Sequence, residues 1–234
     1  MSGHSKWATI KRSKAIVDAK RGKAFTKIIR EIIISARHGG GNPDGNPRLR
    51  AIILKARSLN MPADNVKRAI QRGTGELEGA TIEEVTYEGY GPGGVAMMVE
   101  ATTDNKNRTS ADLRSIFSKN GGNMGESGCV AWMFHKKGVL SVSRDKVNEE
   151  TLMGAVLDAG AEDMKAMESA YEVTTKPEDF EKVRKAMSDA GIDPDDADLT
   201  MVPQTTVHLE GRQAEQLLTL LDSLEDHDDV QNVY

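Results

Sequence analysis

The chain has 234 residues, of which 31 are Lys or Arg, 36 are Asp or Glu and one is Cys. A single cysteine excludes an internal disulfide and any metal site built from several thiolates, and it favours a reducing, cytoplasmic location. No apolar run approaches the roughly 20 residues that cross a bilayer, and the first residues do not resemble a signal peptide, so we expect neither a membrane partner nor export.

The charge is divided unevenly along the chain. Residues 1–78 carry 17 Lys and Arg against 6 Asp and Glu, a net charge of +11. Residues 79–234 carry 14 against 30, a net charge of −16. A basic module joined to an acidic body favours a polyanion as the partner of the first part and repels it from the second. The alternative is a solvated basic surface without a ligand.

Residues 19–37 show the clearest helical period of the chain. At about 100° per residue, the apolar side chains share one side of the helix and the cations share the other. The apolar positions are Phe25, Ile28, Ile29, Ile32, Ile33 and Ala36. The cations are Lys20, Lys23, Lys27, Arg30 and Arg37. We expect the first side to pack in a core and the second to bind phosphate, with a merely solvated face as the alternative.

Two shorter helices are predicted next. Asn46 is suited to cap the second helix and Pro47 to open it. Pro62 opens a third helix, which ends at Gly73. The exposed side of this third helix carries Lys67, Arg68 and Arg72. Three helices with short connections predict a small basic bundle within residues 1–78.

A basic segment precedes this bundle. Residues 6–14 contain four cations, one tryptophan and no acid. Exposed Lys and Arg favour phosphate, whereas Trp7 suits either stacking on a base or plugging the bundle. No recognition helix with a dimer seam is evident, so base-specific reading is not predicted. The predicted nucleic-acid-binding residues of the basic module are Lys6, Trp7, Lys11, Arg12, Lys14, Lys20, Lys23, Lys27 and Arg30.

Two glycine-rich segments follow in the acidic part. The first lies within residues 85–102, between two predicted strands, and its Gly89, Gly91 and Gly94 formally match the G-x-G-x-x-G pattern. A dinucleotide fingerprint must open a helix, whereas a strand-like segment follows here, so a hairpin turn is predicted. The second segment, residues 121–128, is expected to be a flexible loop with no readable function.

A helix is predicted between these two segments. Thr109 and Asp112 have the spacing of a capping box at its start. Lys106 and Arg108 lie just before it, where free N–H groups and the helix dipole favour an anion. Two interpretations stay open here, a secondary anion site and a plain surface loop.

Residues 130–202 twice repeat the order of a strand, a helix and Asp-Ala-Gly. The two helices are predicted after an Asn148 cap and from Pro177 onward. The predicted strands cover residues 139–142, 171–175 and 199–202. A duplicated β-α-β unit is typical of a ferredoxin-like fold.

The last residues resemble half a domain. A strand at 206–209, a leucine-rich helix and a strand from Val230 are predicted. The last strand is expected to complete the sheet that begins at Val85, which makes residues 130–202 an insertion. The predicted fold is α+β, with a basic three-helix domain at 1–78, an α/β domain at 79–129 plus 203–234, and an inserted ferredoxin-like α/β domain at 130–202.

The sequence offers little support for an enzyme. The five histidines show no metal-ligand spacing, and neither a Walker A sequence nor a G-x-S-x-G elbow is present. Residues 193–198 resemble the start of a calcium loop but have Asp where that loop needs Gly. The acids of residues 225–229 fit solvating charge better than a metal-dependent nuclease, and Cys129 fits a buried structural thiol better than a nucleophile. We expect no catalysis, no cofactor, no metal and no small-molecule substrate.

An ordered set of motifs resembles the YebC/PmpR family, which includes the mitochondrial translational activator of cytochrome c oxidase subunit I. The resemblance covers essentially the whole chain. It is carried by Gly3-His-Ser-Lys-Trp7, Ala19-Lys-Arg-Gly-Lys23, Phe25-Thr-Lys-Ile-Ile-Arg-Glu31, Gly39-Gly-Gly41, Asn46-Pro-Arg-Leu-Arg50, Tyr87-Glu-Gly-Tyr-Gly-Pro-Gly-Gly94, Asn107-Arg-Thr109, Phe117-Ser-Lys119, Gly121-Gly-Asn123, Asp158-Ala-Gly-Ala-Glu-Asp163 and Glu225-Asp-His-Asp-Asp-Val230.

This resemblance implies three domains and a non-catalytic regulator of gene expression. The implied function is that of a DNA-binding transcriptional regulator, and the alternative is a ribosome-associated, rRNA-binding translation factor that relieves stalling, including at proline runs. Phosphate contacts suit DNA and ribosomal RNA equally, so the expected partner is nucleic acid and, in the alternative, the ribosome. A protein–protein adaptor with an incidental basic face ranks third.

Overall fold

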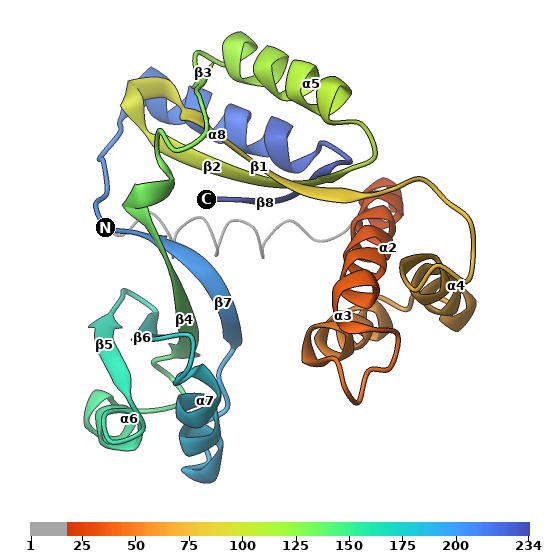
Figure 1. The fold of residues 1–234 in the computed structure, drawn as a ribbon. Helices are drawn as coiled ribbons and strands as arrows, with labels where there is room; N and C mark the ends of the chain where they lie inside the picture. Colours follow the sequence, from red (N-terminus) through yellow and green to blue (C-terminus); the bar gives the residue numbers. More distant parts are fainter. Residues whose placement is uncertain (1–17) are drawn as a thin grey trace. The chain divides into compact units, whose positions relative to one another are not determined.

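The computed structural model describes residues 18–234. They form two compact units, one made of the described residues up to Trp132 together with residues 206–234, and the other of residues 133–205. Helices combine with two antiparallel four-stranded sheets (Figure 1), which confirms the α+β class. None of the described helices is long and apolar enough to cross a membrane. The finer domain boundaries stay predictions.

The first unit begins with three helices, α2 (Asp18–Gly39), α3 (Pro47–Ser58) and α4 (Ala63–Gly73). The Asn46 side chain accepts a hydrogen bond from the Leu49 N–H at 3.0 Å, which confirms the predicted cap of α3. α3 and α4 both pack against α2 through one apolar cluster. Its buried members are Ile28, Ile32, Ile33, Leu49, Ile52, Ala56, Met61 and Ala69.

A four-stranded sheet completes this unit, with the strand order β3-β1-β2-β8. The strands are β1 (Glu83–Tyr90), β2 (Ala96–Thr103), β3 (Asn123–Met124) and β8 (Val230–Val233). Helices α5 (Lys106–Lys119) and α8 (Gly211–Glu225) cover one face (Figure 1), with Leu113, Phe117, Leu220 and Leu224 in the core. The pairing of β8 with β2 confirms that the last strand joins the sheet begun near Val85.

The turn between β1 and β2 is the short 3₁₀ segment η1 (Pro92–Gly94), so the hairpin prediction is confirmed. Gly93 has φ +71°, and a Cβ there would lie 2.4 Å from Cδ2 of Leu209. The prediction of a strand at 206–209 is wrong, because this segment does not pair with any strand. Instead, Leu209 packs against Gly93 in the turn between β1 and β2.

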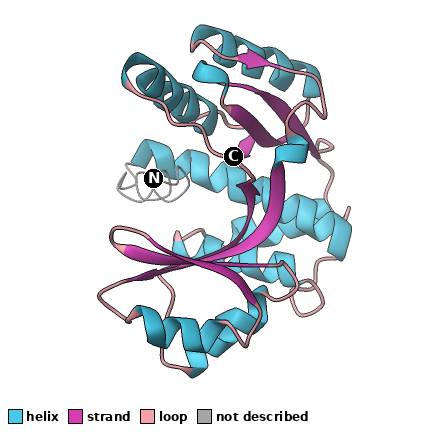
Figure 2. Cartoon of the chain, turned by 90° about the vertical axis from the view of Figure 1, so that its left-hand side faces the viewer, coloured by secondary structure: helices cyan, strands magenta, loops and turns pink. Residues whose placement is uncertain are grey.

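The second unit has the order β4, α6, β5, β6, α7, β7 along the chain and the sheet order β5-β6-β4-β7. Its neighbouring strands are all antiparallel, as in a ferredoxin-like fold, which confirms that prediction. Figure 2 shows both helices on one face of the sheet. The bounds are β4 (Phe134–Ser143), α6 (Glu149–Val156), β5 (Ala161–Ala166), β6 (Ala170–Thr175), α7 (Phe180–Asp189) and β7 (Asp196–Pro203), with η2 (Ala131–Met133) just before β4.

Two details of this unit differ from the sequence prediction. β5 was not predicted, because it is an edge strand that places only Ala161 and Met164 against the core. α7 starts at Phe180 and not at Pro177, and the Phe180 ring packs directly over Gly138 of β4.

Candidate nucleic-acid interface

Three cations of α2 contact the C-terminal end of α8 and the segment that follows it. Lys23 Nζ donates to the carbonyl oxygen of Asp226 at 2.8 Å, and Lys27 Nζ donates to that of Glu225 at 2.7 Å. Arg30 Nη1 donates to the carbonyl oxygen of Asp228, also at 2.8 Å. The last carbonyls of a helix lack partners within the helix and lie at the negative end of its dipole, so cations stabilise them. This face therefore has a structural role within the protein.

The rest of the predicted basic set is not described. Lys6, Trp7, Lys11, Arg12 and Lys14 lie outside the described residues, and so does the Lys20 side chain. Their assignment to phosphate binding stays a prediction.

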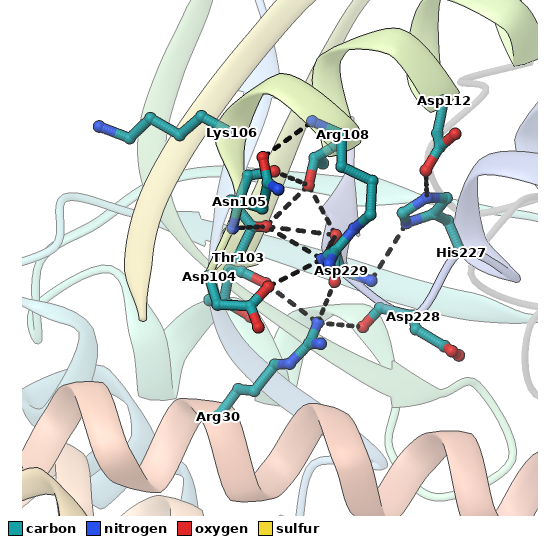
Figure 3. Close-up of polar contacts among 12 residues, drawn as sticks. Arg30, Thr103, Asp104, Asn105, Lys106, Arg108, Asp112, His227, Asp228 and Asp229 are labelled. Carbon is teal, nitrogen blue, oxygen red and sulfur yellow. Dashed lines mark hydrogen bonds and ion pairs between the residues drawn. The ribbon is translucent and has the colours of Figure 1, made fainter. Parts of the chain in front are cut away.

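Asp229 is the centre of the junction between α2 and the sheet (Figure 3). Its carboxylate accepts hydrogen bonds from Thr109 Oγ1 at 2.6 Å, Arg108 Nη2 at 2.9 Å and Arg30 Nη1 at 2.5 Å, and only 3% of the side chain is exposed. Burial alone would raise the pKa of this carboxyl, but the bonds from Thr109, Arg108 and Arg30 outweigh it and lower the pKa to about 2. Asp229 is thus an ionised, buried anchor.

This role of Asp229 corrects the interpretation of residues 225–229 as solvating charge. Asp226 and Asp228 are exposed, but Asp229 is buried directly before the core residue Val230. The His227 Nδ1 accepts a hydrogen bond from the Asp229 N–H at 3.1 Å. Within residues 18–234, no group of three or more His, Cys, Asp or Glu side chains is placed to hold a metal. The position of one acid next to an apolar strand is the sequence signal that distinguishes it.

The predicted secondary anion site contains cations that already have anionic partners. Lys106 forms an ion pair with Glu83, and Arg108 pairs with Asp104 and Asp229, both at 2.9 Å. Glu83, Asp104 and Lys106 line a hollow of about 380 Å³ at the start of α5. Both cations are neutralised inside the protein, so this geometry does not add support for an anion ligand.

The start of α5 also differs from the predicted capping box. Asn105 is the cap, and its side chain accepts a hydrogen bond from the Arg108 N–H at 3.1 Å. Thr109 lies inside the helix, where its hydroxyl donates to Asp229 and is fully buried. The capping-box prediction with Asp112 is therefore wrong, because Thr109 is needed at the Asp229 junction.

Glu88 fixes the loop that follows β3, a role that the sequence did not reveal. Its carboxylate accepts three backbone hydrogen bonds, from the N–H of Gly128 at 2.7 Å and from those of Val130 and Ala131 at 2.8 Å each. Glu88 is 4% exposed, and burial alone would raise the pKa of its carboxyl. The hydrogen bonds from the three N–H groups outweigh burial, so the pKa lies below its ordinary value. The glycine-rich loop thus has an ordered end. Burial also raises the pKa of the half-buried Cys129 thiol, which disfavours the nucleophilic thiolate.

The exposed cations of α4 differ from those of α2. Lys67, Arg68 and Arg72 are exposed, and their side chains form no ion pair or hydrogen bond with any other residue that the structure describes. Ala69 and Gly73 are buried on the other side of the helix, against α2. The free positive charge of the described helical region therefore includes this face of α4, which the sequence had marked as exposed.

The comparisons with known proteins cover the whole chain. The family described as "TACO1/YebC protein N-terminal domain" matches residues 5–76, and "TACO1/YebC second and third domain" matches residues 82–234. A "Probable transcriptional regulatory protein" of Pelotomaculum thermopropionicum is 57% identical over all of this chain and 97% of its own length, and one of Acidobacterium capsulatum is 59% identical over all of this chain and 95% of its own. A crystal structure of a conserved hypothetical protein from Aquifex aeolicus is 48% identical and matches with a TM-score of 0.81 over 95% of this chain and 92% of its own.

Proposed function

Because the chain belongs to the TACO1/YebC family, we propose that it is a non-catalytic, DNA-binding transcriptional regulator. Curated relatives that match all of this chain are named as probable transcriptional regulatory proteins. The observation that carries DNA binding is the concentration of positive charge in residues 1–78, part of which the structure leaves free on α4. The acidic remainder of the chain opposes DNA elsewhere on the protein.

A cationic surface of this kind acts mainly on phosphate. Lys and Arg side chains that contact phosphates release condensed counterions, so affinity falls steeply with salt. The same contacts are available on ribosomal RNA, so a ribosome-associated translation factor is the second candidate. The sequence motifs support this candidate, because the family that they resemble includes a mitochondrial translational activator.

The full chain is expected to bind a 30-base-pair DNA duplex with an affinity that falls linearly in a log–log plot against salt, with a slope of about −3 or steeper. Fluorescence anisotropy of labelled DNA at several salt concentrations measures this slope. Sedimentation of cell lysate after DNase treatment is the companion experiment. Failure to bind DNA at low salt, together with salt-sensitive migration with ribosomes, would replace the proposal with the translation factor; binding to neither would favour an adaptor.

A further inference from the structure

Helices α3 and α4 form a pair joined by a tight turn. Only residues 59–62 separate the two helices. Asn60 in this turn has φ +57°, and it is the one non-glycine residue with positive φ within residues 18–234. A left-handed Asn is tolerated because its short polar side chain bonds locally, and it lets the chain reverse direction quickly. Met61, buried to 7% exposure, anchors the turn in the core.

The outward face of α4 is a ridge of cations. At about 100° per residue, Lys67, Arg68 and Arg72 share an arc of roughly 140°, and the centre of that arc lies opposite the buried side of the helix. That buried side contains Val66, Ala69, Ile70 and Gly73. The acid of the first turn, Asp64, lies at the positive end of the helix dipole. The second helix of the pair thus presents its charge directly away from the core.

Several cations on other described helices are held by partners within the protein, although Arg114 and Lys119 on α5 are not. On α2, Lys23 and Lys27 donate to the end of α8, and Arg30 donates to Asp228 just after it. On α7, each cation pairs with an acid of the same helix or its cap, as in Lys182 with Asp179 and Lys185 with Asp189. The α4 ridge has no such partner within the described residues, so its charge is available to an external polyanion.

The surroundings of the ridge favour a double helix over single-stranded nucleic acid. Binding of unstacked bases uses exposed aromatic rings as platforms. Phe25 is the one aromatic residue of positions 18–78, and its side chain packs against the apolar cluster of the helices. The described ridge therefore offers charge and no stacking surface.

We propose that α4 is the helix that docks in the major groove of double-stranded DNA, with Lys67, Arg68 and Arg72 on its phosphates and groove edges. This inference rests on the proposed function and names the site of contact. The B-DNA major groove is about 12 Å wide and admits a helix, whereas the major groove of A-form RNA is too narrow. The three cations span about 7.5 Å along the helix axis, within a single groove.

The test compares two double variants of the full chain that remove the same charge. Lys67→Gln with Arg72→Gln removes two cations from α4, and Arg114→Gln with Lys119→Gln removes two exposed cations from α5 that have no partner among the described residues. The α4 variant is expected to lower the magnitude of the salt slope for duplex DNA by about 2 and to weaken binding roughly fifty-fold at 0.1 M salt. The α5 variant is expected to stay within about twofold of wild type. Unchanged thermal unfolding shows that both variants fold.

The outcomes separate this inference from the function on which it rests. Wild-type protein that binds DNA while the α4 and α5 variants lose equal affinity would overturn the α4 assignment and leave DNA binding intact. An RNA duplex of the same sequence, bound as tightly as DNA, would overturn the major-groove placement. Wild-type protein that binds neither duplex would remove the proposed function itself. A single Arg68→Gln variant, expected to change the slope by about 1, gives an independent second reading.

Discussion

Asp229→Asn is expected to lower the free energy of unfolding by about 3 kcal/mol. The substitution keeps the shape of the side chain but replaces one acceptor oxygen with an amide that points at donors. Thr109 and Arg30 would remain largely buried without the carboxylate, whereas the half-exposed Arg108 would be rehydrated, which limits the loss. Urea denaturation of the full chain, followed by circular dichroism, measures the change.

Asp228→Asn is the matched control, since its side chain is exposed one residue away and the expected change is within about 0.5 kcal/mol. Acid provides a second check. The pKa of Asp229 is lowered from 3.8 to about 2, so its stabilisation is present above about pH 4 and is lost as the pH falls toward 2. This difference corresponds to about 2 kcal/mol. An equally steep acid loss of stability in Asp229→Asn would contradict the assignment.

Glu88→Gln is expected to cost about 2 kcal/mol of unfolding free energy. One carboxylate oxygen of Glu88 accepts from Gly128 and the other from Val130 and Ala131. An amide has only one acceptor oxygen, so its NH₂ group would face at least one of these backbone N–H groups. Two donors cannot form a hydrogen bond, so that N–H would lose its partner. Chemical denaturation measures the cost, and hydrogen exchange is expected to be faster for residues 125–131 than in wild type.

The control for Glu88 is Glu126→Gln, which alters an exposed carboxylate in the same loop. We expect this variant to unfold within about 0.5 kcal/mol of wild type. Equal stability of the two variants would show that the three N–H bonds do not hold the loop.

Much of the fold was accessible from local pattern. The 3.6-residue period of α2, the Asn46 cap and the repeated β-α-β order all depend on residues close together in sequence. β5 was missed because an edge strand with few core contacts carries little alternation. The segment 206–209 alternates like a strand, but its surroundings, the β1–β2 turn, are set by residues more than 100 positions away.

The candidate site was harder to predict, because a lysine in a sequence does not reveal its acceptor. Lys23 and Lys67 are both exposed cations on amphipathic helices. The carbonyl of Asp226 that Lys23 contacts lies 203 residues away, and periodicity contains no information about it. Glu88 and Asp229 were missed for the same reason, since each is buried by donors from distant segments. The charge pattern thus predicted the basic region. Only the tertiary contacts show which of its cations have partners within the protein and which do not.

Hydrogen–deuterium exchange of the full chain, with and without a saturating 30-base-pair DNA duplex, tests the central claim most directly. We predict that DNA slows exchange in the amides of α4, residues 63–73, while α5, residues 106–119, is unchanged. Slowed exchange confined to α5 or to residues 133–205, with α4 unaffected by bound DNA, would contradict it.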